Sequence, residues 1–170
     1  DAVRDKDANA ATLMFAEFVA YLKAHELSYS DFLDEIYLKY GYFKEDLLSF
    51  TFDGAEGVNK IKRLMDLYRS KTTKRYNNVR VLTTTDFLSG GGKDADGKEI
   101  PASDFIIIRL LDGCSIAIRP SGTEPKLKMY LFAQANVEKG ENLNEIKSII
   151  SERLTSLKAW LQKDVSERLK

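Results

Sequence analysis

This sequence has few of the residues from which disulfides, histidine chemistry and membrane spans are built. Its 170 residues include a single cysteine, Cys114, and a single histidine, His25. One cysteine cannot form a disulfide within the chain, which fits a reducing compartment, and one histidine is too few for a histidine-containing triad or metal cluster. No stretch is apolar for long enough to span a bilayer. These absences predict a soluble, cytoplasmic protein.

Net charge is also absent, because 26 lysines and arginines balance 26 aspartates and glutamates. No overall field draws the chain to nucleic acid or acidic lipid, so we expect neither a nucleic-acid nor a membrane partner. Hydrophobic residues make up 44% of the chain, which excludes a disordered protein. The first residue is Asp1, within a charged segment, and we therefore expect a fragment of a longer protein.

The hydrophobic pattern predicts an α+β domain preceded by two helices. Residues 9–24 and 31–40 have helical periodicity, but two such helices cannot close a core, so we expect them to be the end of another domain. Strands are predicted over 47–52, 79–87, 105–111, 114–119 and 126–134, and helices after residue 53 and over 143–169. This order predicts an antiparallel sheet with helices packed on one face.

Three local signals refine this prediction. Asp112 and Gly113 predict a two-residue hairpin turn between neighbouring strands. The helix after residue 53 is expected to bury a stripe formed by Val58, Ile61, Met65 and Tyr68. The segment 94–97, Asp-Ala-Asp-Gly, superficially resembles a metal-binding loop, but the rest of that pattern is missing, and a hydrated hairpin tip is expected instead.

The run Arg119-Pro120-Ser121-Gly122-Thr123-Glu124-Pro125 lies between two alternating strands. Gly122 lets a ligand approach the backbone closely, and successive amides in a tight turn can form an anion-binding nest. Ser121 and Thr123 offer hydroxyl donors, and Arg119 adds a planar fork of donors that matches phosphate. The composition therefore predicts a phosphate cradle. The alternative, an ordinary surface turn with a solvated arginine, holds for most stretches that match only Ser-Gly-Thr.

Three motifs of this chain resemble the α-D-phosphohexomutases, the phosphoglucomutase and phosphomannomutase superfamily. "RPSGTEPK" (119–126) resembles the phosphate-binding loop of the family's last domain, and "VRDKDA" (3–8) the segment after its sugar-recognition loop. "LDEIYLKYGYF" (33–43) is similar to the larger bacterial members. The resemblance implies that residues 1–42 end the third mutase domain. Residues 43–170 would then form the C-terminal phosphate-binding domain, whose sheet and helices have the layout of TATA-binding proteins.

The resemblance also implies a reaction. In this family a phosphoserine of the first domain exchanges its phosphoryl group with a hexose 1-phosphate or 6-phosphate, through glucose or mannose 1,6-bisphosphate. The serine loop and the Mg²⁺ loop of the family do not occur in this sequence. The expected partners are therefore hexose phosphates and the missing N-terminal domains of the same polypeptide. No metal ligand is expected here, and the chain alone is predicted to be inactive.

The same resemblance assigns roles to individual residues. The residues expected to grip the non-reacting phosphate are Arg119, Ser121, Gly122 and Thr123. Lys126 would either add charge to this site or lie on the solvent face. Lys6 matches a family lysine that reaches the active site, where it would contact phosphate or assist proton transfer; the alternative is a solvated lysine in a charge run.

Two other functions stay open at this point. A stand-alone phosphate- or phosphosugar-binding module would recognise without catalysing, and the upstream sequence would distinguish it from a mutase. Nucleic-acid binding, suggested by the TATA-binding layout, is disfavoured by the zero net charge and by the lack of a basic-aromatic cluster in the sequence. Glucose and mannose phosphates differ at C2, which a phosphate clamp would not read. Aromatic residues among the first 40 would face the missing domain, so we expect exposed apolar surface there.

Overall fold

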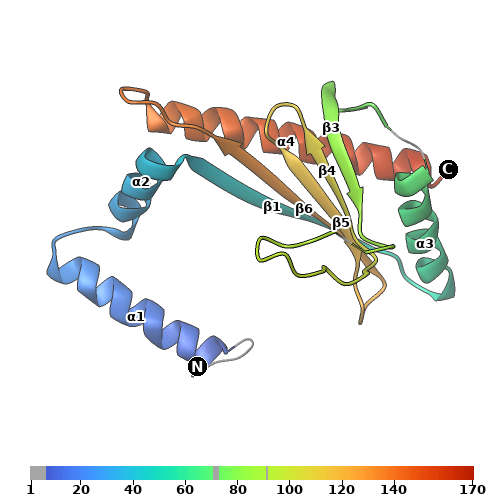
Figure 1. The fold of residues 1–170 in the computed structure, drawn as a ribbon, viewed down its shortest axis with the longest axis horizontal. Coiled ribbons are helices and arrows are strands. Elements are labelled where there is room, and N and C mark those ends of the chain that lie inside the picture. The colour runs from blue at the N-terminus through green and yellow to red at the C-terminus, as the bar shows by residue number, and fades with distance from the viewer. Residues whose placement is uncertain (1–6, 71–72, 91) are drawn as a thin grey trace.

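A computed structural model describes residues 7–70, 73–90 and 92–170 of the chain (Figure 1). Its centre is a six-stranded antiparallel sheet with the order β1-β6-β5-β4-β3-β2. The strands are β1 (Tyr42–Thr51), β2 (Arg75–Tyr76), β3 (Val79–Asp86), β4 (Ile106–Leu110), β5 (Ser115–Pro120) and β6 (Lys126–Ala135). The helices are α1 (Ala8–Ala24), α2 (Tyr29–Tyr40), α3 (Ala55–Ser70) and α4 (Leu143–Arg168). The predicted α+β class is confirmed.

Helices α3 and α4 pack on one face of the sheet. The alternate apolar residues of β6 are buried, and they are Leu127, Met129, Leu131 and Ala133. These side chains belong to one hydrophobic cluster with Leu64 of α3 and Leu157 of α4. Burial of each large apolar side chain contributes about 1.5–3 kcal/mol. On the opposite face, Ala117 and Tyr130 line an open hollow of about 380 Å³.

Local features of the sequence account for both the start and the buried face of the long helix α4. Asn142 caps its first turn, because its side-chain Oδ1 accepts from the amide nitrogens of Asn144 at 3.0 Å and Glu145 at 3.4 Å. A stripe at helical spacing then faces the sheet, and its buried members are Ile150, Leu154, Leu157, Leu161 and Val165. Figure 1 shows α4 running the length of the sheet.

The two N-terminal helices bury little of their apolar surface. Asp7 caps α1 and Ser28 caps α2, but Leu22 is the one residue of α1 that is buried. Leu13 is 71% exposed and Met14 is 66% exposed. The predicted exposed apolar surface is therefore confirmed, and α1 projects away from the sheet (Figure 1). No helix in the described ranges is long and apolar enough to cross a membrane.

The prediction for the first strand was too short, since β1 begins at Tyr42 and not at residue 47. Charged residues interrupt the apolar pattern here, yet two of them lie on the face towards α4. Lys44 Nζ donates to Ser151 Oγ at 2.7 Å, and Lys158 Nζ donates to Asp46 Oδ1 at 2.8 Å. Polar partners on α4 thus let charged side chains occupy the inner face at the margin of the sheet.

The predicted two-residue turn between β4 and β5 was wrong, because the loop has three residues, 111–113. Leu110 N donates to the Cys114 carbonyl at 2.8 Å, so that Leu110, and not Leu111, lies opposite Cys114. Gly113 has a φ of +83°, the left-handed conformation that ends such three-residue loops. Asp112 accepts from the Cys114 amide at 3.1 Å and from Arg153 Nε at 2.6 Å, so the turn is also bonded to α4.

The predicted buried stripe of α3 was wrong at one position. Val58 is 64% exposed, whereas Leu64 is fully buried. Ile61, Met65 and Tyr68 are buried as predicted. The first turn of the helix is instead buried at Gly57, which lies against Phe52, and the buried side chains of the stripe begin at Ile61.

Candidate functional site

The candidate phosphate loop, residues 121–125, joins the neighbouring strands β5 and β6, neither of which lies at an edge of the sheet. Their pairing continues to the last pair before the loop, Pro120 with Leu127. Beyond it, Ser121 N donates to the Lys126 carbonyl at 2.8 Å, and Phe52 N donates to the Pro125 carbonyl at 3.0 Å. These bonds close the base of the loop and tie it to the end of β1.

The backbone of this loop presents hydrogen-bond donors without acceptors. Among the described residues, the amide nitrogens of Gly122, Thr123 and Glu124 donate to no protein acceptor. A Cβ built on Gly122 would meet no atom within 4 Å, and Gly122 does not have a positive φ. Neither packing nor backbone conformation therefore requires glycine here. Successive free amides beside a position without a side chain suit the close approach of an anion.

The two basic residues of the motif differ in their surroundings. Arg119 is exposed and forms no ion pair with a carboxylate of the described residues. Lys126 Nζ lies 2.8 Å from Glu124 Oε1. This hydrogen bond and the charge of the ammonium hold the pKa of the Glu124 carboxyl below its usual range. Of these two residues, the one without a carboxylate partner among the described residues is therefore Arg119.

The loop borders a hollow of about 470 Å³, a volume within the range of small-molecule sites, about 300–1,000 Å³. Its lining residues are Ser103, Asp104, Phe105, Arg119, Pro120, Ser121 and Gly122. The structure thus brings three predicted residues together, Arg119, Ser121 and Gly122, whereas Thr123 is exposed beside the hollow and Lys126 is bonded to Glu124. Lys6 lies outside the described residues.

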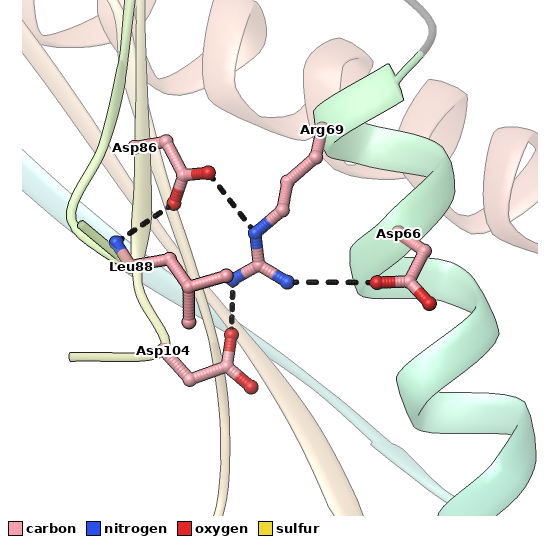
Figure 2. Close-up of polar contacts among 5 residues, drawn as sticks. All are labelled: Asp66, Arg69, Asp86, Leu88 and Asp104. Atoms are coloured by element: carbon pink, nitrogen blue, oxygen red, sulfur yellow. Dashed lines mark hydrogen bonds and ion pairs between the residues drawn. The ribbon is translucent and has the colours of Figure 1, made fainter.

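Asp104 is the acidic residue of this hollow, and Arg69 of α3 pairs with it while it also pairs with two other carboxylates. Arg69 pairs with Asp104, its Nε lies 3.1 Å from Asp86 Oδ2, and its remaining amine lies 3.9 Å from Asp66 Oδ1 (Figure 2). Leu88 N donates to the other oxygen of Asp86 at 3.1 Å. The pKa of the Arg69 guanidinium is lowered by burial, but Asp104 and Asp86 outweigh burial and raise it. Without this cation, the Asp104 carboxylate would repel a phosphate.

Sequence reasoning missed the contribution of Asp104 and Arg69. The two residues are 35 positions apart in the chain, in different elements, and no local motif contains both. The sequence shows only that Arg69 lies at the C-terminal end of an amphipathic helix, and this does not identify its partner. The ion pair forms because the fold places the C-terminal end of α3 beside the segment that precedes β4.

The described residues do not fit a metal ion. They contain no group of three His, Cys, Asp or Glu side chains that could hold one. In the loop at 94–97, Asp94 Oδ1 instead accepts from the amides of Asp96 at 3.0 Å and Lys98 at 2.8 Å. That loop is a hairpin tip in which the carboxylate is used by the backbone, and we derive no catalytic step through a metal in this chain.

Comparison with known proteins supplies a second line of information. No protein-family model matches the chain. A phosphoglucomutase of Staphylococcus epidermidis is 36% identical over 134 residues, which cover 76% of this chain and 24% of that protein. A phosphoglucomutase of Staphylococcus aureus is 34% identical over 133 residues, with the same shares. The chain spans about a quarter of the length of these relatives, and the match falls on their C-terminal quarter.

Proposed function

We propose that this chain, a distant homologue of the C-terminal quarter of phosphoglucomutases at about 35% identity, is the phosphate-gripping part of a hexose phosphomutase. The observation that carries the proposal is the loop at 121–125, with its unpaired amides and the unpaired Arg119 beside one hollow. The whole enzyme would interconvert hexose 1-phosphate and hexose 6-phosphate, and its loop would hold the phosphate that does not react.

The donors of the loop suit a phosphate dianion on simple chemical grounds. Arg119 offers two parallel N–H groups to two phosphate oxygens, and the amides of residues 122–124 offer further N–H groups. All these groups would bind the phosphate, and none of them would contact the sugar ring. Such a site would accept either phosphate of glucose or mannose 1,6-bisphosphate, as a reaction with two substrate orientations requires.

The remaining parts of the enzyme would come from outside this chain. Residues 1–42 would complete a third mutase domain, whose other elements would cover the exposed apolar residues of α1, such as Leu13 and Met14. Lys6 would reach the active site from that domain. The phosphoserine and the Mg²⁺ ligands would lie in earlier domains, and the whole enzyme would be cytoplasmic.

A second candidate is a phosphosugar-binding module that recognises without catalysing. The loop at 121–125 supports this candidate as well, because its free amides would bind a phosphate whether or not a reaction follows. A full-length sequence would separate the two candidates, because a mutase must encode a serine loop and a metal loop before Asp1.

An amide NMR titration with inorganic phosphate, glucose 1-phosphate and glucose 1,6-bisphosphate tests the proposed grip. We expect saturable shifts at residues 121–124 and about tenfold or greater weakening in Arg119→Ala, because a hydrogen bond to a charged group contributes about 1.5–3 kcal/mol. Arg63→Ala, at an exposed arginine of α3, is the matched control and should bind like the wild type. Unchanged binding in Arg119→Ala, or no shift at the loop, would contradict the proposal.

Gly122→Ala separates binding from folding. A Cβ at this position meets no protein atom within 4 Å, so we expect an unchanged melting temperature. The added methyl group would occupy the space in which the phosphate approaches the amides, and we expect about tenfold weaker binding. Thermal melting and the same titration measure the two effects. A lowered melting temperature would show that Gly122 serves the fold instead, and unaltered affinity would contradict the approach of phosphate to the backbone at this position.

A further inference from the structure

A larger hollow, of about 780 Å³, lies along β3 and the C-terminal end of α3. Its charged lining residues are Arg69, Lys74, Arg75, Arg80 and Asp86. Arg69 and Asp86 pair with each other at 3.1 Å, so the charge that is left over comes from three cations. The chain as a whole has no net charge, and this hollow is therefore a local concentration of positive charge.

The three remaining cations lack acidic partners. Within the described residues, no carboxylate oxygen lies within 4.0 Å of a side-chain nitrogen of Lys74, Arg75 or Arg80. Arg75 donates to the Asn78 carbonyl at 2.7 Å, which leaves its charge uncompensated. Arg75 also lies directly opposite Arg80 in the β2–β3 pairing. Like charges in this position repel each other, and a bound anion would remove the repulsion.

The hairpin that carries these cations is anchored to the core. Tyr76 is buried, and its ring lies 5.2 Å from that of Trp160 on α4. Asn77 Nδ2 donates to Ser156 Oγ, also on α4, at 2.8 Å. The backbone that presents Arg75 and its neighbours is thus ordered before any ligand arrives, which lowers the entropy lost on binding.

Neutral donors line the same hollow. Thr83 and Thr84 are exposed on β3, and their hydroxyls have no partner among the described residues. β2 pairs with β3 only at Val79 and Arg80, so from Leu82 onwards the outer edge of β3 has no described strand beside it. Hydroxyls and edge amides add hydrogen bonds to the charge of the three cations.

We propose that this hollow binds a small anion with at least two phosphate groups, at a site separate from the loop at 121–125. Arginine forks and hydroxyl donors are suited to phosphate oxygens. Three cations carry more charge than the roughly two negative charges of inorganic phosphate would compensate, and about 780 Å³ lies in the range of sites for whole small molecules. The lining offers few free acceptors, which excludes cationic ligands.

An amide NMR titration with tripolyphosphate at constant ionic strength tests this site. We expect saturable shifts at residues 74–84 and at least tenfold weaker binding there in Arg80→Gln. Arg63→Gln, at an exposed arginine of α3, is the matched control and should bind like the wild type. Inorganic phosphate should bind at least tenfold more weakly than tripolyphosphate. A parallel titration with citrate separates recognition of phosphate from recognition of multiple negative charge, and equal affinity for citrate would overturn the choice of phosphate.

Arg80→Gln should also raise the melting temperature slightly, since it removes the repulsion from Arg75, and this confirms that the variant folds. Unsaturable shifts spread over all exposed lysines and arginines would overturn the proposal, as would unaltered binding in Arg80→Gln. The loop at 121–124 reports in the same spectra. Shifts at 121–124 without shifts at 74–84 would refute the second site alone. Shifts at 74–84 without shifts at 121–124 would refute the proposed phosphate grip alone.

Discussion

Asp164→Ala is expected to lower the free energy of unfolding by about 2–3 kcal/mol, the cost of leaving polar groups of a largely buried network without their partner. Asp164 Oδ2 accepts from the Tyr68 hydroxyl at 2.7 Å and from Arg168 Nε at 2.7 Å. Tyr68 is 3% exposed and the Arg168 side chain 12% exposed. Truncation therefore leaves the Tyr68 hydroxyl without a partner and Arg168 without its carboxylate, at positions where water replaces the lost bonds only in part.

Urea unfolding with a matched control measures this effect. Lys163 is the neighbouring residue, its side chain is 77% exposed, and its nearest carboxylate, on Glu167, is 3.9 Å away. Lys163→Ala should change the free energy of unfolding by less than about 0.5 kcal/mol. A loss below about 1 kcal/mol for Asp164→Ala, with an unchanged m-value, would mean that the bond network contributes little to stability.

The second large effect is loss of stability in alkali. Burial, assisted by Asp164, raises the pKa of Tyr68 well above its usual range. Burial also raises the pKa of Tyr76 to about 12 and that of the Cys114 thiol to about 11. In the unfolded chain these groups lose their protons near pH 10 for tyrosine and about 8.5 for cysteine. Between the unfolded and folded values, the unfolded state binds fewer protons, so stability falls as the pH rises.

The expected slope is about 1.4 kcal/mol per pH unit for each such group. Cys114 acts first, above about pH 8.5, and the two tyrosines steepen the fall above about pH 10. Urea midpoints measured between pH 8 and pH 11 test this, and Tyr68→Phe should reduce the slope above pH 10. Tyr40→Phe is the control, because Tyr40 is 64% exposed. A midpoint that stays constant to pH 11 would contradict the prediction.

The parts of the fold that the sequence predicted are those in which one periodicity acts alone. On β6 the alternation of Leu127, Met129 and Leu131 reflects one covered face, and the stripe of α4 reflects one buried side. The prediction failed where side chains have partners from distant elements. Lys44 and Asp46 face inward in β1 because α4 supplies hydrogen-bond partners, and no pattern within β1 contains that information.

The site divides in the same way. The loop at 121–125 is a local motif, so its residue types alone predicted an anion cradle. The contribution of Asp104 depends on an arginine of α3, and the ambiguity over Lys126 depends on whether Glu124 turns towards it. Contacts of this kind are set by side-chain rotamers and by packing, which the order of residues does not encode locally.

The position of β5 and β6 inside the sheet restricts the motion of the hairpin that they form. The loop at 121–125 is carried by β5 and β6, and each of these strands has a hydrogen-bonded neighbour on both sides. The hairpin cannot open locally without breaking the ladders to β1 and β4, so its amide hydrogens should exchange with solvent only when the whole sheet unfolds. The free amides of the loop at 121–125 are thus attached to strands that open most slowly. Their own motion is then limited to that of the loop tip.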